Sequence, residues 1–201
     1  MELWYAPTSP FARKVRVAAH ELGLADGLRL VEVNPWTDAR LRALNPLAKV
    51  PTLVLDDGEA VWESGLIAER LEAVAGGRAL FPSAGPERWR ALSLQALADG
   101  AGAAAGRLFA DENRRPDERS EAMLVRFRQA IGASLDHLEG AELRSDPTIG
   151  EISVAVLLGY LDFRWPGRPW TAERPRLQAW YGVFAERASM VETRHRRTAA
   201  A

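Results

Sequence analysis

Hydrophobic residues recur in the first part of the chain with two different spacings, and these spacings predict its first elements. Residues 1–5 form a short, mostly apolar run, which is typical of a buried strand. Phe11, Val15, Ala18 and Leu22 then stand at i, i+4, i+7 and i+11, which places them on one face of a helix. The chain is therefore expected to begin with a strand, a tight turn and a helix.

Ser9 and Pro10 stand where this helix is expected to start. Serine is favoured at the N-cap and proline at the first helical position. An anion at this helix start would meet free backbone N–H groups, the positive end of the helix dipole and a hydroxyl donor together. The residues leave two roles for Ser9 open: a helix cap with no further function, or a donor that stabilises a bound thiolate.

The segment that follows alternates between strand and turn signals up to residue 76. Asp56-Asp57-Gly58 is typical of a hairpin turn. The order of elements from residue 1 is β-α-β-α-β-β-α, which gives a mixed sheet of four strands covered by helices, the thioredoxin-like arrangement. The later strands are expected over 28–33, 52–55 and 60–62, and the later helices over 38–44, capped by Thr37, and over 65–75, opened by Glu63-Ser64.

After residue 86 the strand signals disappear and helical periodicity takes over. Thr148 and Glu151 form the T-x-x-E pattern of a capping box, which is expected to begin an almost wholly apolar and therefore buried helix. The helices of this half are expected over 86–110, 117–139 and 152–163.

These patterns divide the chain into two expected domains. A thioredoxin-like domain is expected over 1–76 and an all-helical domain over 87–201. Residues 77–86 are rich in Gly, Pro and small residues and are predicted to form a linker, with Phe81-Pro82 anchored on the second domain. The tail after Glu192 is expected to be loose.

Composition excludes several classes of function. Of the 201 residues, 47% are hydrophobic and 26% are charged, as in ordinary soluble globular proteins. The formal net charge is −1, so no global field would recruit nucleic acid or an anionic membrane. The chain has no cysteine, which excludes a disulfide framework, a cysteine-based metal site and a protein-thiol nucleophile.

Other features bear on location and on metal binding. No apolar run approaches the ~18 residues needed to span a bilayer, and the N-terminus lacks the basic-then-apolar pattern of a signal peptide, so a cytoplasmic protein is expected. His20, His137 and His195 are too scattered to indicate a metal site by spacing. Lys14 and Lys49 are the only lysines among many arginines, which points to a GC-rich, bacterial coding sequence.

Four short motifs carry a family resemblance. Together they resemble the active-site turn and the later landmarks of the cytosolic glutathione S-transferases of the bacterial type, with a serine in the active-site turn. The resemblance implies a thioredoxin-like domain that binds glutathione, followed by a helical domain with a pocket for the electrophile. The motifs are Thr8-Ser9-Pro10-Phe11-Ala12-Arg13-Lys14-Val15-Arg16, Asn34-Pro35-Trp36-Thr37-Asp38, Asn45-Pro46-Leu47-Ala48-Lys49-Val50-Pro51 and Glu63-Ser64.

The resemblance gives the first motif a catalytic role. Ser9 would donate its hydroxyl hydrogen to the glutathione thiolate, with Thr8, one residue earlier, as the second-ranked donor. Phe11 would also contact glutathione. Because the chain has no cysteine, the thiol-exchange chemistry of this superfamily is not expected.

The resemblance assigns the remaining glutathione contacts to the later motifs. Val50-Pro51 would be a cis peptide bond, and the N–H and C=O of Val50 would pair with the cysteinyl part of glutathione. Ser64, as an N-cap, would bind the γ-glutamyl carboxylate, Glu63 the γ-glutamyl amino group, and Lys49 the glycyl carboxylate. Without the resemblance, Pro51 would only begin a strand and Lys49 would be a solvated side chain.

The function implied by the resemblance is the transfer of glutathione, as co-substrate and without a metal, to small hydrophobic electrophiles in detoxification. A homodimer is expected, with neither nucleic acid nor a membrane as partner. Trp165, Trp170 and Tyr181 either line the electrophile pocket or pack in the core. Two other functions stay open: a non-catalytic binding or regulatory module of the same fold, and a glutathione-dependent isomerase, dehalogenase or peroxidase.

Overall fold

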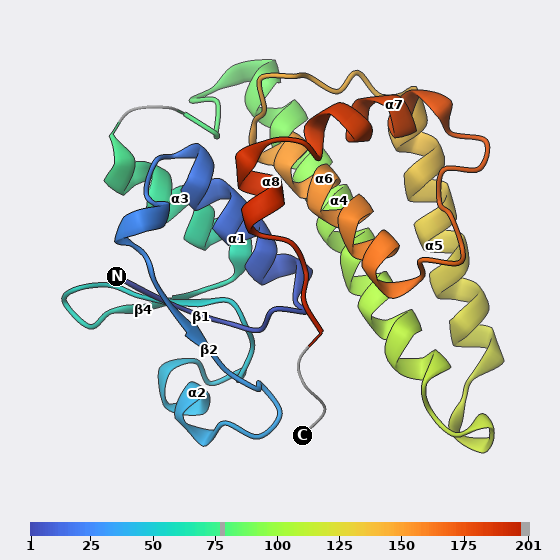
Figure 1. Cartoon of the computed structure of the whole chain (residues 1–201), viewed down its shortest axis with the longest axis horizontal. Coiled ribbons are helices and arrows are strands. Elements are labelled where there is room, and N and C mark those ends of the chain that lie inside the picture. The colour runs from blue at the N-terminus through green and yellow to red at the C-terminus, as the bar shows by residue number, and fades with distance from the viewer. Residues whose placement is uncertain (77–78, 198–201) are drawn as a thin grey trace. The chain divides into compact units, whose positions relative to one another are not determined.

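The computed structural model describes residues 1–76 and 79–197, and the chain divides into two compact units (Figure 1). The first unit comprises Met1–Trp89 and the chain from Arg187 onward, and the second comprises Arg90–Glu186. The first is built around a small sheet, and the second is helical. The predicted fold class, a thioredoxin-like domain followed by a helical domain, is therefore confirmed.

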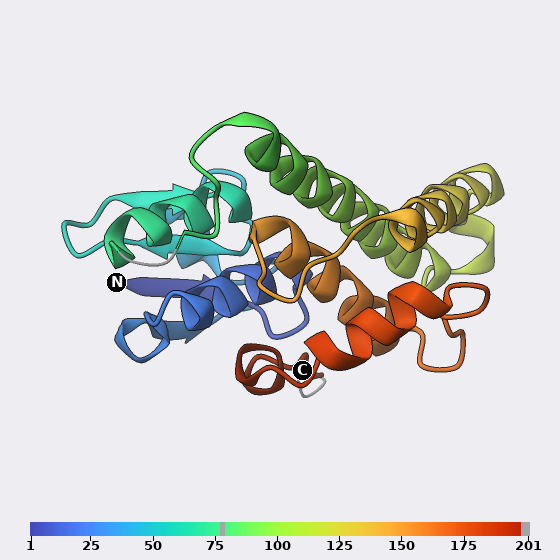
Figure 2. The same cartoon turned by 90° about the horizontal axis from the view of Figure 1, so that it is seen from above.

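The first unit has the predicted order of strands and helices. Its helices α1 and α3 pack side by side, and α2 lies on the opposite side of the strands (Figures 1 and 2). Leu3, Val15, Leu53 and Ile67 are fully buried in its core. The elements are β1 (Glu2–Tyr5), α1 (Pro10–Glu21), the 3-10 turn η1 (Ala25–Gly27), β2 (Arg29–Glu32), α2 (Ala39–Leu44), β3 (Thr52–Val54), β4 (Ala60–Trp62), α3 (Ser64–Ala75) and α8 (Ala188–Glu192).

The sheet has the strand order β2-β1-β3-β4. β1 is parallel to β2 and antiparallel to β3, and β3 is antiparallel to β4. Trp4 on β1 pairs with Thr52 on β3, Thr52 pairs with Trp62 on β4, and Tyr5 pairs with Glu32 on β2. This register brings the last residues of β1, β2 and β4 and the first residue of β3 to one end of the sheet.

Local hydrogen bonds determine where the first helices begin. Ser9 is the N-cap of α1 and Pro10 is its first residue, as predicted. The prediction that Thr37 caps α2 is wrong, because the carboxylate of Asp38 accepts the N–H of Arg40 at 3.1 Å and Asp38 is the N-cap.

In the second unit, the predicted helices are present with altered limits. α5 begins at Glu121 rather than at residue 117, because a separate 3-10 turn precedes it. α6 is buried over nearly its whole length and begins with the predicted capping box of Thr148 and Glu151. The elements are α4 (Gly85–Glu112), whose first residues belong to the first unit, the 3-10 turn η2 (Pro116–Glu118), α5 (Glu121–Gly140), α6 (Ile149–Arg164) and α7 (Pro175–Phe184).

Three aromatic residues considered for a pocket lie in the core of the helical unit. Trp170 is buried there, and Trp165 and Tyr181 pack against the same cluster. The indole N–H of Trp170 binds Asp162 at 2.7 Å, and that of Trp165 binds Glu112 at 2.8 Å. Their polar tips are therefore satisfied within the protein, as is usual for buried indoles.

The end of the chain packs on the first unit, whereas the predicted boundary put it in the helical domain. Arg187 and Ser189 donate hydrogen bonds of 2.6–2.9 Å to the carboxylate of Glu21 in α1. Residues 193–197 continue along the first unit with further hydrogen bonds, so the prediction that the tail is loose is wrong for these residues. Contacts between distant parts of the chain, which no local pattern reports, hold this segment.

The second half of the predicted linker also belongs to the first unit. Leu80 and Phe81 are buried, and the Glu72 carboxylate of α3 accepts both of their N–H groups, that of Phe81 at 2.8 Å. Phe81 is thus anchored on the first domain rather than on the second. Residues 77 and 78 of the predicted linker lie outside the described residues.

Candidate functional site

Four segments meet at the end of the sheet where β1 terminates. Residues 6–9 follow β1, residues 33–38 follow β2, residues 45–51 precede β3, and Glu63 follows β4. Neighbouring strands lie about 4.8 Å apart, so the strand register brings these segments together. The site residues predicted from the sequence lie in the segments 6–9 and 45–51 and at Glu63, or directly after these segments in the chain.

Ser9 uses its hydroxyl oxygen as an acceptor at the start of α1. The Oγ accepts the N–H of Ala12 at 3.2 Å, and the N–H of Ser9 donates to the carbonyl of Ala6 at 3.0 Å, which closes the turn after β1. A hydroxyl has one donor hydrogen and two acceptor lone pairs. The Ser9 hydrogen has no acceptor within residues 1–76 and 79–197. The side chain is therefore able to cap the helix and donate to an anion at the same time.

Val50 and Pro51 are joined by a cis peptide bond, as predicted. In the part of the chain that the structure describes, neither the N–H nor the C=O of Val50 has a hydrogen-bond partner. Backbone groups inside proteins are normally paired. The half-buried Val50 thus offers a donor and an acceptor to a ligand that supplies the complementary pair.

Asn45 holds the loop that carries Lys49 and Val50, a role that the sequence patterns did not predict. Its side chain is 1% exposed and donates to the Lys49 carbonyl at 3.1 Å and to the Thr52 hydroxyl at 3.0 Å. It also accepts the N–H of Leu47 at 2.9 Å. An Asn before a Pro predicts the end of a helix, and nothing in that signal indicates a buried amide that organises the next loop.

Glu63, and not Ser64, is the N-cap of α3, so that part of the prediction for Ser64 is wrong. One carboxylate oxygen of Glu63 accepts the N–H groups of Gly65 and Leu66 at 3.0 and 3.2 Å, and the other accepts the Ser64 hydroxyl at 3.2 Å. The longer side chain reaches these groups because Glu63 has φ +79°, a conformation that costs free energy in a residue other than glycine. Strain of this kind gathers at functional sites.

Ser64 is the first residue of α3 and is 2% exposed. Its backbone N–H is one of the donors that a helix start leaves unpaired, and it has no partner among the described residues. The Ser64 hydroxyl has a single hydrogen, which it donates to the Glu63 carboxylate, so the backbone N–H is the donor of Ser64 that stays open to a ligand. An N–H at a helix start suits a small carboxylate.

Lys49, Phe11 and Thr8 lie beside these groups in the chain. Lys49 is exposed, and the described chain contains no ion pair to its ammonium group. Phe11 and Thr8 are half-buried, and Thr8 already has an interaction within the protein. Within the described chain, the ammonium group of Lys49 therefore has no ion-pair partner, and the hydroxyl hydrogen of Ser9 has no acceptor.

A cluster of charged side chains joins the C-terminal residues to the same end of the sheet. Arg196 donates to the Tyr5 hydroxyl at 3.2 Å and to the Glu32 carboxylate at 3.1 Å. The guanidinium of Arg16 lies over the Tyr5 ring, 5.2 Å from its centroid. Burial lowers the pKa of Arg16, and the charge of Arg196 adds to this effect, while Tyr5 and Glu32 oppose it. Sequence patterns did not predict this cluster, because its members lie far apart along the chain.

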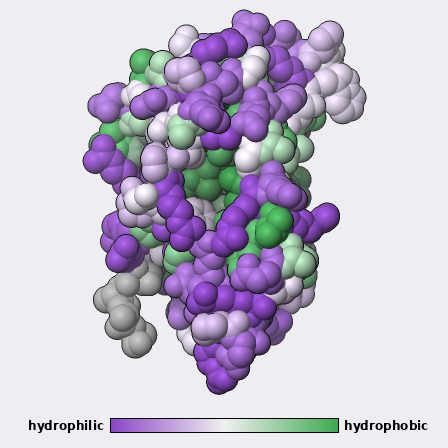
Figure 3. Space-filling view, turned by 90° about the vertical axis from the view of Figure 1, so that its right-hand side faces the viewer, coloured by the Kyte–Doolittle hydropathy of each residue, from purple (hydrophilic) through white to green (hydrophobic). Residues whose placement is uncertain are grey.

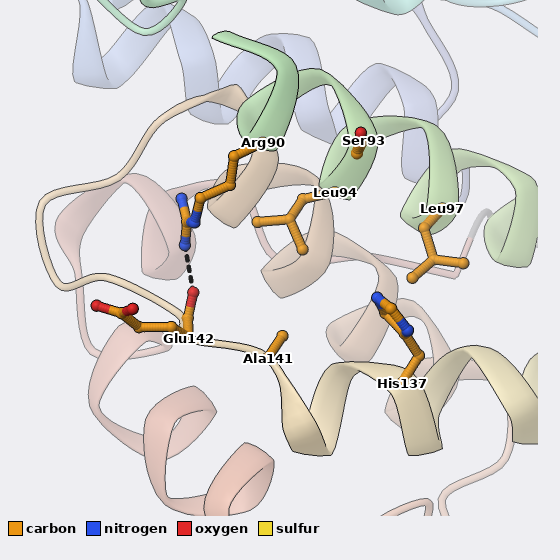
Figure 4. A pocket seen from close by; sticks show the side chains of 7 residues that line it. All are labelled: Arg90, Ser93, Leu94, Leu97, His137, Ala141 and Glu142. Carbon is orange, nitrogen blue, oxygen red and sulfur yellow. Dashed lines mark hydrogen bonds between the residues drawn. The ribbon is translucent and has the colours of Figure 1, made fainter. Parts of the chain in front are cut away.

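The helical unit has a cavity of about 420 Å³ (Figure 4). Leu94 and Leu97 point toward it from α4, and the Arg90 side chain reaches the backbone carbonyl of Glu142. The aromatic residues considered for a pocket are not among the lining residues described. On the face seen from the side of α5, hydrophilic residues predominate and hydrophobic ones gather in and beside a hollow (Figure 3). The lining residues are Arg90, Ser93, Leu94, Leu97, His137, Ala141 and Glu142.

Residues 1–76 and 79–197 lack two features that would change the chemistry or the location expected of the chain. This part of the chain contains no group of three or more His, Asp or Glu side chains placed to hold a metal ion. It also contains no helix that is long and apolar enough to cross a membrane.

Comparison with known proteins identifies both halves of the chain. The glutathione S-transferase N-terminal domain matches residues 8–74, and the glutathione S-transferase C-terminal domain matches residues 87–182. YibF, a GST-like protein of Escherichia coli K12 that is itself uncharacterised, is 36% identical over 184 residues. That alignment covers 88% of this chain and 90% of YibF.

Solved structures resemble the whole chain. A glutathione transferase family member from Pseudomonas fluorescens Pf-5 with bound glutathione is 39% identical, with a TM-score of 0.93 over 98% of this chain and 99% of that one. A second structure of a Pf-5 family member, with bound S-(propanoic acid)-glutathione, is 38% identical, with a TM-score of 0.89 over 98% and 100% of the two chains. With both domains matched and relatives aligned over almost their full length, the chain belongs to the glutathione S-transferase family.

Proposed function

We propose that this protein is a glutathione transferase that adds the glutathione thiolate to small hydrophobic electrophiles, with Ser9 stabilising the thiolate. One observation carries the proposal. At one end of the sheet, three segments present polar groups that have no partner in the described chain. They are the hydroxyl hydrogen of Ser9, the N–H and C=O of Val50, and the N–H of Ser64.

These groups match the chemical parts of glutathione. The N–H and C=O of Val50 would pair with the cysteinyl residue, and the N–H of Ser64 would bind the γ-glutamyl carboxylate, joined by the Ser64 hydroxyl once its hydrogen turns from Glu63 to the ligand. The Glu63 carboxylate keeps lone pairs beyond those used in capping, which suit the γ-glutamyl ammonium. Lys49 would supply a point charge for the glycyl carboxylate. Relatives that hold glutathione in their crystals support glutathione as the ligand of this site.

Ser9 would act by lowering the pKa of the bound thiol. A hydrogen bond to a charged acceptor contributes roughly 1.5–3 kcal/mol, and a helix N-terminus roughly 0.3–1 kcal/mol more. At ~1.36 kcal/mol per unit, the thiol pKa would fall by about 2 units from its usual value near 8.5. Because nucleophilicity falls with basicity, the net gain is only ~3-fold. Most of the acceleration would then come from holding the thiolate beside the electrophile.

The proposed reaction needs no redox partner. The sulfur forms a bond to an electrophilic carbon while a halide leaves, or while the carbon next to the attacked position of a conjugated double bond takes up a proton. One relative holds S-(propanoic acid)-glutathione, a thioether whose added chain carries a carboxylate. A substrate screen for this protein should therefore include unsaturated and halogenated short-chain acids as well as chlorodinitrobenzene. Isomerase, dehalogenase and peroxidase substrates, tested in the same screen, separate these activities from transfer.

The first experiment is a calorimetric titration of the purified protein with reduced glutathione. We expect binding in the millimolar range or tighter, and weaker binding after Glu63→Ala combined with Ser64→Ala. Ser83→Ala, an exposed serine outside the four segments, is the control and should bind as the wild type does. No binding at about 10 mM would contradict the proposal and favour a non-catalytic interaction module.

Family membership supports two further proposals. We propose that the protein is a homodimer in solution, and that it acts in the cytoplasm in detoxification. Analytical ultracentrifugation at micromolar concentration tests the homodimer. The sedimentation coefficient of a monomer would contradict it. Fractionation of the native host checks the second.

A further inference from the structure

The last described residues of the chain lie against the turn that carries Ser9. The C-terminal segment, residues 193–197, follows α8 and passes the end of β1 (Figure 1). The carbonyl oxygen of Pro7 lies 3.2 Å from Nδ1 of His195 and accepts the backbone N–H of Arg196 at 3.3 Å. Pro7 precedes Ser9 by two residues, so the C-terminal segment contacts the backbone of the turn itself.

The partner of His195 determines where its hydrogen must be. A proline carbonyl can only accept, so Nδ1 carries the hydrogen of this hydrogen bond. Both the Nδ1–H tautomer of neutral imidazole and the imidazolium have that hydrogen. The contact with Pro7 therefore does not require a change in the protonation of His195.

A buried arginine fixes the start of the C-terminal segment to α1. Arg13, which is 6% exposed, donates to the Met190 carbonyl at 3.0 Å and to the Thr193 hydroxyl at 3.5 Å. The Thr193 hydroxyl in turn donates to the Ser189 carbonyl at 2.6 Å. The N–H of Arg13 also donates to the Ser9 carbonyl at 3.1 Å in the first turn of α1. The segment is thus anchored to the same helix that Ser9 begins.

We propose that His195 is a positioning residue for Ser9 and acts through Pro7. The turn between β1 and α1 has an internal hydrogen bond from the Ser9 N–H to the Ala6 carbonyl. Pro7 has no N–H that could add a second hydrogen bond to this turn. Among the described residues, its carbonyl accepts hydrogen bonds from His195 and Arg196. A catalytic group must be kept within about 0.5 Å of its productive place. The inference rests on the proposed role of Ser9 in stabilising the thiolate.

Two variants of His195 and one control test this role in the full-length protein. His195→Leu removes the donor, whereas His195→Asn keeps an N–H donor near the position of Nδ1. Arg194→Ala is the control, since Arg194 is exposed and its side chain makes no hydrogen bond or ion pair within the described chain. The measurements are the ultraviolet absorbance of the thiolate of bound glutathione as a function of pH, and kcat and KM with chlorodinitrobenzene.

We expect His195→Leu to raise the pH at which the bound thiol ionises and to lower kcat on the order of tenfold. The KM for glutathione should change little, because the contact of His195 that carries this inference is with the backbone of Pro7 and not with Val50, Glu63 or Ser64. His195→Asn and Arg194→Ala should behave as the wild type does. A residue that only fastened the tail would lower stability and leave the ionisation midpoint unchanged, so an unchanged midpoint in His195→Leu overturns the inference.

A double-mutant cycle with Ser9→Ala separates this inference from the proposed function. If His195 acts through Ser9, His195→Leu produces no further shift of the midpoint in the Ser9→Ala background. If the ionisation midpoint shifts in Ser9→Ala and not in His195→Leu, the inference is overturned and the proposed function stands. If the ionisation midpoint does not shift in Ser9→Ala, Ser9 does not stabilise the thiolate, and His195 then has no such role to support.

Hydrogen exchange gives an answer that needs no ligand. In the ligand-free protein, the amide hydrogens of Ser9 and Ala12 should exchange faster in His195→Leu than in Arg194→Ala. The reason is that the turn has lost the hydrogen bond between His195 and the Pro7 carbonyl. Equal exchange in the two variants shows that the C-terminal segment does not hold the turn, and this overturns the inference even if glutathione does not bind.

Discussion

Ser9 shows, at the scale of a residue, that a helix cap and a thiolate donor can be one side chain. From the sequence these were two competing roles. In the structure the oxygen accepts from Ala12 while the hydroxyl hydrogen keeps no internal acceptor, so the roles use different parts of the same group. Substitutions at this position are able to separate the two contributions.

Replacing Ser9 by Ala and by Asp should give different results. Ser9→Ala removes both cap and donor, so the free energy of unfolding should fall by about 0.5–2 kcal/mol and the pKa of the bound thiol should rise by about 1 unit or more. Ser9→Asp keeps a capping oxygen but has no hydrogen to donate, so stability should be retained while the thiol pKa still rises. Urea denaturation and thiolate absorbance measure the two effects.

Thr8→Ala decides which hydroxyl is the main donor. The thiol titration of this variant should match that of the wild type. A larger shift with Thr8→Ala than with Ser9→Ala would instead make Thr8 the donor.

Asn45→Ala tests whether a buried amide organises the binding loop. We expect the free energy of unfolding to fall by about 1–3 kcal/mol, because the carbonyl of Lys49 and the hydroxyl of Thr52 lose a buried partner. Glutathione affinity should also fall, since this loop carries Val50. Asn34→Ala is the control: Asn34 is exposed and accepts one backbone N–H at 3.0 Å, so its loss should cost less than about 0.5 kcal/mol. Unchanged affinity in Asn45→Ala would exclude the loop from the binding site.

At the scale of elements, the start of α6 depends on a close approach to α4. A Cβ added at Gly150 would lie 2.7 Å from the carbonyl oxygen of Ala91 and 2.9 Å from Cβ of Leu94. Beside this contact, Arg90 of α4 binds the fully buried carboxylate of Glu151 at 2.8 Å. The predicted capping box therefore has a second function, since its Glu also joins two helices.

Gly150→Ala should destabilise the helical unit. The new methyl group must displace backbone of α4, which typically costs about 1–3 kcal/mol. Gly132→Ala in α5 is the matched control, because an added Cβ there meets nothing within 4 Å. That variant should gain roughly 0.5–1 kcal/mol from helix propensity. Equal free energies of unfolding for the two variants in urea would show that α4 and α6 do not approach so closely.

At the scale of the whole molecule, paired carboxylates make stability depend on pH. Burial alone would raise the pKa of Glu151, but hydrogen bonds from Thr148 and Arg90 outweigh it and the pKa is lowered. Burial likewise opposes the lowering of the Glu112 pKa, which hydrogen bonds from three neighbouring side chains bring about. Each carboxylate contributes stability that is fully present above the ordinary value of 4.5 and is lost as the pH falls through the lowered pKa.

Glu151→Gln should reduce this pH dependence. At pH 7 the variant leaves the charge of Arg90 without its buried partner, so the free energy of unfolding should fall by about 3–5 kcal/mol. As the pH falls below 4.5 and through the lowered pKa, the difference from the wild type should shrink, because the wild-type carboxylate then takes up a proton and loses its charge. Urea denaturation over this pH range measures it. Glu142→Gln, at an exposed side chain with no ion pair in the described chain, should follow the wild type at every pH. If the free energies of unfolding of Glu151→Gln and the wild type differ by the same amount at every pH, the stabilising role assigned to the ionised Glu151 carboxylate is contradicted.

The order of the elements and most of the places where they begin follow from local patterns in the sequence. The period of the hydrophobic positions, the Ser9-Pro10 helix start, the Asp56-Asp57-Gly58 turn and the capping box at Thr148 are local signals, and the structure confirms each of them. Such signals act within a few residues of the chain, so their outcome does not depend on the rest of the fold. The motifs that resemble the family also located the segments that meet at one end of the sheet.

The side chains that support those segments are set by the packing of the folded chain. Glu63 caps α3 through an unusual backbone conformation, the side chain of Asn45 is buried beneath the loop that Asn45 begins, and His195 reaches Pro7 from the far end of the chain. The first two contacts join residues close in sequence, but the backbone conformation and the burial on which they depend are set by how strands and helices pack. Residues distant in sequence become neighbours only through the sheet register and helix packing, and no periodicity or local motif records such a neighbour.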